Sequence, residues 1–232
     1  LIVHALDLGV DKIILALGGS ATNDGGCGMA CALGVRFLNS LGEEFIPVGG
    51  TLKDISKIDL SGLDERLQNI EVTTMCDIDN PLYGPNGAAY IFGPQKGATS
   101  TTLPILDDGL RHLAKIVTND LDLDYAEVPG SGAAGGMGFG SMVFMKAKLQ
   151  MGIEAVLDAV DFNHLLNQAD YVFTGEGQFD DQSLRGKVVI GVARRAKKKN
   201  VPVIALVGQI RGSLGEAYDL GVTSMFSINT KA

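Results

Sequence analysis

The chain has 232 residues, of which 46% are hydrophobic and 20% are charged, proportions that are ordinary for a globular protein of one or two domains. Its formal net charge of −8 at pH 7 argues against a nucleic-acid partner, because phosphates require a basic surface. No run of about 18 apolar residues is present, so neither a membrane span nor a membrane partner is expected.

Three cysteines indicate a reducing compartment. Their number is odd and they show no C-x-x-C spacing, so free thiols are expected rather than a disulfide framework. The segment that begins at Leu1 has no basic n-region and no small-residue cleavage site, and it does not read as a signal peptide. We therefore expect a cytoplasmic protein.

The N-terminal part of the chain predicts a strand, a polar loop and a helix in succession. Residues 1–9 are predicted to form the last part of a helix. Residues 12–17 form a continuous apolar run, typical of a strand buried on both faces. The loop 18–26, with the sequence GGSATNDGG, precedes a predicted small-residue helix over 27–33. This order of elements is where α/β proteins bind anions.

The middle of the chain alternates regular elements with loops rich in glycine. Residues 34–70 predict a short strand and turns, and a strand over 70–75 leads into an acidic, Pro- and Gly-rich stretch at 76–97. An amphipathic helix is predicted over 103–119. A second Gly-rich loop, 129–138, leads into a helix whose Met and Phe residues we interpret as core.

The pattern changes at about residue 166. Strands are predicted at 170–174, 201–207 and 224–228, with helices at 188–199 and 214–220. Strands separated by helices in this way indicate a right-handed parallel unit. We therefore predict an α/β fold with two domains, residues 1–165 and 166–232.

The chain contains 31 glycines, gathered with polar residues in a few loops. We interpret these loops as places where backbone amides approach a ligand, since glycine has no Cβ and accepts positive φ.

Several common catalytic templates are absent from the sequence. It has no Walker A motif, no H-E-x-x-H motif and no Cys/His cluster, and its three histidines lie outside the polar loops. Residues 130–135 match G-x-G-x-x-G, but no clear strand precedes them and no acidic residue ends a second strand about 20 residues later. A nicotinamide-dependent dehydrogenase therefore stays a weak alternative.

Acidic and amide side chains follow several of the predicted strands. The loop 174–183 begins at a strand end and carries three carboxylates, and further acidic side chains follow the strands that end near residues 17 and 75. Phosphoryl transfer requires such groups, because carboxylates hold Mg²⁺, an Asp can accept a hydroxyl proton, and Lys neutralises phosphate. Taken singly, Asp24 and Asp180 are equally well explained as helix caps or Asx-turns.

Five motifs in order resemble those of the type-I family of bacterial glycerate kinases. They are residues 18–26, 76–82, 92–98, 132–138, and 174–177 followed by Asp180, Gln182, Ser183, Gly186 and Lys187. The resemblance spans nearly the whole chain. It implies an inserted α/β domain at 1–165, the later part of a Rossmann- or flavodoxin-like parallel-sheet domain at 166–232, and an active site in the cleft between them.

The resemblance also implies an activity. We expect ATP- and Mg²⁺-dependent phosphorylation of D-glycerate to a phosphoglycerate, with 2-phosphoglycerate as the expected product and a monomer or homodimer as the assembly. Family members carry sequence before Leu1, including the first strand of the Rossmann-like domain, and sequence beyond Ala232. We therefore expect these residues to be part of a longer protein, and the alternative is a catalytically incomplete fragment that binds ligand or partner without turnover.

The site residues implied by the resemblance fall into three groups. The candidate catalytic residues are Asp77, Asp180 and Lys187; the candidate substrate- or phosphate-binding residues are Ser20, Asn23, Asp24, Asn80, Gln95, Lys96 and Ser183; and the candidate metal ligands are Glu176 and Asp180. Asp77 and Asp180 are expected as base or metal carriers, and Lys187 as a charge partner.

Overall fold

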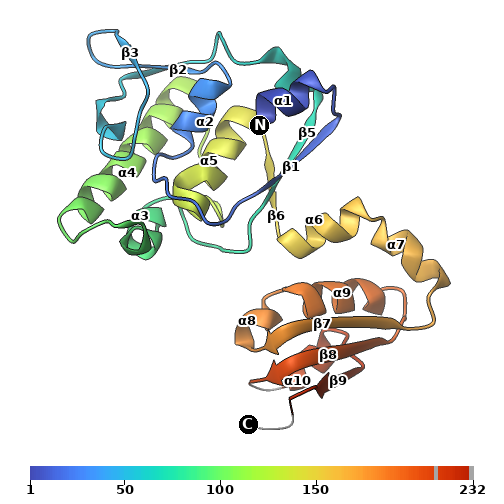
Figure 1. Cartoon of the computed structure of the whole chain (residues 1–232). Helices are drawn as coiled ribbons and strands as arrows, with labels where there is room; N and C mark the ends of the chain where they lie inside the picture. Colours follow the sequence, from blue (N-terminus) through green and yellow to red (C-terminus); the bar gives the residue numbers. More distant parts are fainter. Residues whose placement is uncertain (212–213, 230–232) are drawn as a thin grey trace. The chain divides into compact units, whose positions relative to one another are not determined.

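The computed structural model describes residues 1–211 and 214–229, whose secondary structure is drawn in Figure 1. The chain divides into two compact units, Leu1–Gln150 and Met151–Ala232. Each unit contains a parallel sheet and its own hydrophobic core, so the predicted α/β class is confirmed in both. No helix in the described part of the chain is long and apolar enough to cross a membrane.

The division lies before α6 (Gly152–Ala159) and α7 (Phe162–Leu165), which we had placed in the first domain. Arg195, in α9 (Val188–Lys197), explains why these helices belong to the second unit. Its Nε donates to the Glu154 carboxylate of α6 at 2.8 Å, and apolar side chains of α6 join the core beneath α9. The observed division therefore precedes the predicted boundary, because periodicity alone does not show which core a helix joins.

The sheet of the first unit has the strand order β1-β5-β6. Its strands are β1 (Lys12–Ala16), β5 (Glu71–Met75) and β6 (Lys148–Gln150). The strands expected at 12–17 and 70–75 are confirmed, and β6 was not predicted. The expectation that 12–17 is buried on both faces is wrong. β1 is an edge strand with alternating burial and leaves Ile14 41% exposed, whereas the central β5 is buried at three of its five positions.

A small antiparallel sheet and several helices complete the first unit. The sheet contains β3 (Glu44–Phe45), β2 (Arg36–Leu38) and β4 (Lys57–Asp59) in that order. The short helix η1 (Leu52–Asp54) lies between β3 and β4, and η2 (Glu65–Asn69) lies between β4 and β5. The helices are α1 (Ile2–Asp7), α2 (Cys27–Ala32), α3 (Ala88–Phe92), η3 (Pro94–Lys96), α4 (Thr102–Leu121) and α5 (Ala133–Met145). Helices expected at 1–9, 27–33 and 103–119 are thereby confirmed.

The core of the first unit lies between α4, α5 and the antiparallel sheet. The ring of Phe37 in β2 meets Phe144 of α5 edge-on, with centroids 5.9 Å apart. The Met and Phe residues of α5 are largely buried, which confirms their interpretation as core. At its start α5 departs from helical geometry, because Ala134, Gly135 and Gly136 all have positive φ.

The second unit carries the parallel sheet β7-β8-β9. Its strands are β7 (Val172–Phe179), β8 (Val203–Ile210) and β9 (Ser224–Ser227), and its remaining helices are η4 (Leu166–Gln168), α8 (Asp181–Leu184) and α10 (Gly215–Asp219). The three predicted strands are confirmed. β7 is longer than expected, so Glu176, which we had placed in a loop, is a strand residue. α9 packs against β7 and β8. Val203, Ala205 and Val207 of β8 are buried in the core of this unit.

Candidate functional site

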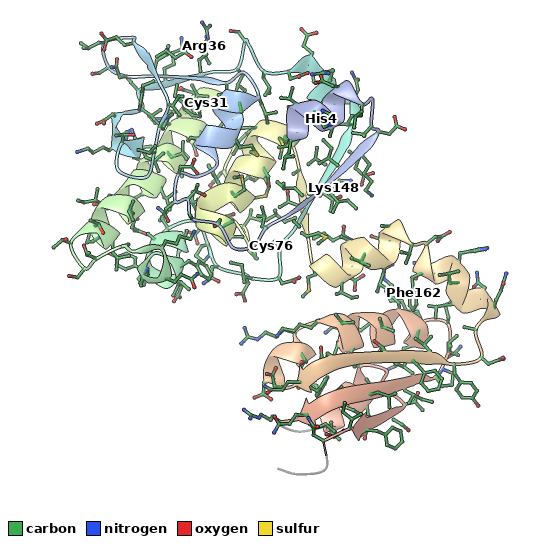
Figure 2. All side chains as sticks on the ribbon, in the orientation of Figure 1. His4, Cys31, Arg36, Cys76, Lys148 and Phe162 are labelled. Carbon is green, nitrogen blue, oxygen red and sulfur yellow. The ribbon has the colours of Figure 1, made fainter. Side chains whose placement is uncertain are left out.

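A pocket of about 510 Å³ lies at the carboxyl ends of β1 and β5 in the first unit, and Cys76, labelled in Figure 2, marks the end of β5. Its walls are formed by residues 16–20, 75–78, 92, 95, 96, 133 and 134. The pocket brings together four of the predicted site residues, Ser20, Asp77, Gln95 and Lys96. Ser20 and Asp77 meet because the neighbouring parallel strands β1 and β5 end at the same edge of the sheet, and η3 contributes Gln95 and Lys96.

Two glycines of the pocket wall leave space that a side chain would occupy. A Cβ atom built on Gly18 or Gly19 would meet no other atom within 4 Å, so the backbone here is open to the pocket. This agrees with the interpretation of the loop as a place where backbone approaches a ligand.

Other glycines of the same loop have a different purpose. Gly25 donates its N–H to the Gly135 carbonyl at 3.0 Å, and a Cβ on Gly135 would lie 1.9 Å from the Thr22 carbonyl oxygen. A Cβ on Gly136 would lie 2.7 Å from Gly25 Cα. The two Gly-rich loops therefore pack backbone against backbone, and much of their glycine serves this contact rather than ligand binding.

Lys96 carries a cation that forms no ion pair within the part of the chain that the structure describes. Its Nζ donates to Ser20 Oγ at 3.0 Å and to the Thr22 carbonyl oxygen at 2.7 Å. Among the described residues no carboxylate forms an ion pair with this ammonium. Burial lowers the pKa of Lys96, and the charge of Asp24 opposes that effect only in part. A partly desolvated ammonium on a pocket wall is suited to bind an anion.

The structure gives Asp24 the capping role that the sequence offered as its alternative. Its Oδ1 accepts the N–H of Gly26 and its Oδ2 accepts the N–H of Gly28, both at 3.0 Å, at the start of α2. Asp24 is 9% exposed and does not line the pocket described above. Both carboxylate oxygens are thus engaged in holding the loop and helix together.

Asn23 and Asp24 line a separate pocket of about 440 Å³, to which Lys96 also contributes. The side-chain oxygen and nitrogen of Asn23 are both buried, and neither has a hydrogen-bond partner within the described residues. Asn80 lines neither pocket. Its Nδ2 donates to the Asn86 carbonyl oxygen at 2.8 Å and so stabilises the loop that follows β5.

The remaining predicted residues gather in the second unit, around Glu176 near the carboxyl end of β7. Burial is the main reason that the pKa of Glu176 is raised. A hydrogen bond with Ser183 and the charge of Lys187 act in the opposite direction, while the charge of Asp180 adds to the rise. The other three predicted residues of this unit, Asp180, Ser183 and Lys187, therefore all influence Glu176.

Asp180 and Ser183 form a reciprocal cap on α8. Ser183 donates its N–H to Asp180 Oδ1, and Asp180 donates its N–H to Ser183 Oγ, both at 3.2 Å. Asp180 Oδ2 also accepts from Gln178 Nε2 at 2.9 Å. This is the capping arrangement that the sequence allowed for Asp180 considered alone.

The predicted ligands of a divalent cation in the second unit are two carboxylates, Glu176 and Asp180. The described residues contain no cluster of three or more His, Cys, Asp or Glu side chains that could hold a metal ion. Mg²⁺ is commonly bound through one or two carboxylates together with substrate phosphates, so Glu176 and Asp180 fit that requirement. The buried Oε1 of Glu176, which has no hydrogen-bond partner within the described residues, supplies an oxygen available to a cation.

Sequence reasoning missed two contributors to the first pocket. The carbonyl oxygen of Thr22 holds Lys96, and Ala134 lines the pocket in a left-handed conformation with φ 54°. A backbone carbonyl has no sequence signature. The position of Ala134 directly before Gly135 and Gly136 was the available signal for an unusual backbone.

Comparison with known proteins identifies the family that this chain resembles. The sequence matches the glycerate kinase family over residues 1–232. It is 48% identical over 228 residues to the glycerate kinase of Halalkalibacterium halodurans, a match that covers 98% of this chain and 60% of that protein. It is 45% identical over 230 residues to the glycerate 2-kinase of Escherichia coli, covering 99% of this chain and 60% of that protein.

A solved structure gives the same relationship. The crystal structure of a candidate glycerate kinase 2 from Salmonella typhimurium superimposes with a TM-score of 0.86 at 45% identity, covering 97% of this chain and 59% of that one. The chain thus spans about 60% of the length of the curated relatives it matches. On the family match and on these identities, the chain belongs to the glycerate kinase family.

Proposed function

We propose that this chain carries the residues by which a glycerate kinase transfers a phosphoryl group from ATP to a hydroxyl of D-glycerate. The observation that carries the proposal is the Lys96 ammonium, which is partly buried, lacks an ion-pair partner among the described residues and lies on the wall of a pocket shared with Asp77. A small hydroxy acid offers the two groups that this pair requires: a carboxylate for the cation and a hydroxyl for the carboxylate.

In the first unit the roles follow from the chemistry of the lining. Lys96 and the Ser20 hydroxyl bind the substrate carboxylate through charge-assisted hydrogen bonds. Gln95 and the open backbone at Gly18 and Gly19 hold the rest of the molecule. Asp77 accepts the proton of the attacking hydroxyl, as the base of a phosphoryl transfer does.

In the second unit we propose that Glu176, Asp180, Ser183 and Lys187 bind the nucleotide phosphates and Mg²⁺. When bound, Mg²⁺ neutralises the charge that the phosphate oxygens carry. The two carboxylates hold the cation, Ser183 keeps Asp180 in position through the cap, and the Lys187 ammonium faces the phosphates as a further positive charge. The buried Oε1 of Glu176, which has no hydrogen-bond partner among the residues that the structure describes, supports this assignment.

The product we propose is 2-phosphoglycerate, on the name of the Escherichia coli relative, a glycerate 2-kinase. We further propose that the first unit corresponds to the inserted domain of the family and the second to the later part of its Rossmann- or flavodoxin-like domain. A cytoplasmic location and a monomeric or homodimeric state remain predictions of the same proposal.

A coupled assay of ADP release with D-glycerate, ATP and Mg²⁺ tests the activity. Turnover that requires all three is expected of the full-length protein, and a folded protein that releases no ADP in response to D-glycerate contradicts the proposal.

The second candidate is a fragment that binds without turnover, which the 60% coverage of the relatives favours for these 232 residues by themselves. Calorimetry with D-glycerate and with ATP separates the two candidates. Binding of D-glycerate by the 232-residue chain without ADP release supports the fragment, and sustained turnover by this chain rejects it.

A further inference from the structure

We propose that Gly135 is a positioning residue for Lys96, acting through the backbone carbonyl of Thr22, so that the Gly-rich start of α5 controls the affinity of the first unit's pocket for a carboxylate. The proposal rests on the function proposed above, because it concerns the same pocket. It assigns a role to a residue that does not line the pocket.

The first step is the attachment of the ammonium. Lys96 Nζ has three N–H donors, and two of them are directed at Ser20 Oγ and at the Thr22 carbonyl oxygen. The third is left for a ligand. The Thr22 contact, at 2.7 Å, is the shorter of the two, and it fixes the ammonium to the backbone of the loop rather than to a rotatable side chain.

The second step is the support of that carbonyl. Gly135 has φ 72°, and a Cβ built on it would lie 1.9 Å from Thr22 O and 2.8 Å from Asn23 Cα. Nothing larger than hydrogen fits between these backbones. Gly135 also accepts the N–H of Gly25 through its own carbonyl, so it contacts the 18–26 loop at two points.

The third step is a comparison of Gly135 with its neighbour Gly136. Gly136 also has a positive φ, of 91°, but a Cβ on it would meet Gly25 Cα and the Leu82 side chain, not Thr22. The two glycines thus share a positive φ and close packing, so a Cβ is unfavourable at both, whereas contact with the carbonyl that holds Lys96 belongs to Gly135. This makes Gly136→Ala a matched control for Gly135→Ala.

The test uses the full-length protein and two readouts, the reactivity of Lys96 and the affinity for D-glycerate. Brief acetylation with acetic anhydride, read residue by residue by mass spectrometry, reports whether the amine is held. In the wild-type protein the rate constant of the neutral Lys96 amine is obtained from rates at several pH values, because burial lowers the pKa of Lys96. It is expected to be about tenfold lower than that of the exposed Lys57, since the hydrogen bonds to Ser20 and Thr22 must break first. Equal rates in the wild-type protein would overturn the proposal whether or not any variant folds.

Gly135→Ala is expected to raise the acetylation rate of Lys96 and the Kd for D-glycerate by about tenfold each, leaving the Kd for ATP unchanged. Gly136→Ala is expected to lower Tm while leaving both the Lys96 rate and the D-glycerate Kd at wild-type values. If both variants change the Lys96 rate equally, Gly135 has only a general packing role and the proposal fails.

The two readouts separate this proposal from the proposed function. If the wild-type protein does not bind D-glycerate, the proposed function fails, and the acetylation rates still decide whether Gly135 positions Lys96. If D-glycerate binds and the Lys96 rate in Gly135→Ala equals that of wild type, the positioning role fails alone.

Discussion

The two units present opposite electrostatic arrangements at the carboxyl ends of their parallel strands. The first unit offers Lys96, a cation with no ion-pair partner among the described residues, held by a hydroxyl and a backbone carbonyl. The second offers Glu176, a carboxylate with a buried oxygen that has no hydrogen-bond partner there. The same strand-end position can therefore serve an anionic ligand or a cationic one, depending on which side chains it carries.

The difference also lies in what builds each site. In the first unit, two loops hold the ammonium in position, and they pack backbone against backbone. Glycine is required where the two backbones touch. In the second unit, Glu176 lies on an extended strand and Asp180 caps a short helix, so side-chain hydrogen bonds and charge do the positioning. An acid substrate in the first unit and a metal–nucleotide in the second would suit this division.

The largest effect is expected at the proposed base. Asp77→Asn keeps the size of the side chain but cannot accept the substrate proton, so kcat is expected to fall by about 10²–10⁴-fold with Tm unchanged. Steady-state ADP release and thermal unfolding check this. Asp180→Asn is the paired variant, because Asn can keep the cap on α8. A near-normal kcat in Asp77→Asn together with a loss in Asp180→Asn would assign the base to the second unit.

A smaller effect is expected at the anion site. Lys96→Met removes the ammonium and keeps much of the aliphatic chain, so the Kd for D-glycerate is expected to rise by about 10–100-fold while the Kd for ATP stays constant. Isothermal titration measures both constants. Lys12→Met is the matched control, because its amine is exposed and pairs with Glu71 at 3.4 Å on the surface. An unchanged D-glycerate affinity in Lys96→Met would remove the cation from the acid site.

The Glu176 carboxylate is expected to lower the stability of the second unit and to increase its affinity for Mg²⁺. Burial raises the folded-state pKa of Glu176, so its charged form opposes folding at neutral pH. Glu176→Gln is therefore expected to raise Tm by about 1–2 °C at pH 7 while raising the Mg²⁺ concentration for half-maximal activity by about tenfold.

The effect of Glu176→Gln on Tm is expected to depend on pH. A group with a raised folded pKa contributes stability below its unfolded pKa and loses that contribution as pH rises through the folded pKa. The advantage of Glu176→Gln in Tm should therefore shrink as the pH falls toward the ordinary Glu pKa of 4.5. Thermal melts from pH 4 to pH 8 would show an advantage that grows with pH, and an advantage that is constant over this range would contradict the buried-carboxylate explanation.

The smallest effect concerns the strained backbone beside the first pocket. Ala134 has φ 54° and ψ 40°, a left-handed conformation that is unfavourable for a residue with a Cβ. Ala134→Gly is expected to stabilise the first unit by about 1 kcal/mol or less, since relief of strain is partly offset by the greater freedom of the unfolded chain. Denaturant unfolding measures this, and a loss of stability would mean that the Ala134 methyl group contributes more as packing than its conformation costs.

Much of the fold and part of the site could be predicted from the sequence. Hydrophobic periodicity located β1, β5, α4 and the strands of the second unit, because burial follows the geometric repeat of each element. The motifs identified the family, and they named Ser20, Asp77, Gln95 and Lys96, which the first pocket brings together. The short β6 was missed because three residues carry too little periodicity.

Tertiary structure decided what each loop residue does. Asp24 and Asn23 are adjacent in the GGSATNDGG loop, yet Asp24 caps α2 with both oxygens while the Asn23 amide is buried without a hydrogen-bond partner in the described structure. The Asp24 cap is local and agrees with a sequence pattern. The surroundings of Asn23 include the Gly-rich start of α5, more than 100 residues away along the chain, where a Cβ on Gly135 would lie 2.8 Å from Asn23 Cα. The sequence by itself determined that polar loops follow buried strands. Contacts between distant backbones decided which glycines face a ligand, and which, like Gly135, hold another loop in place.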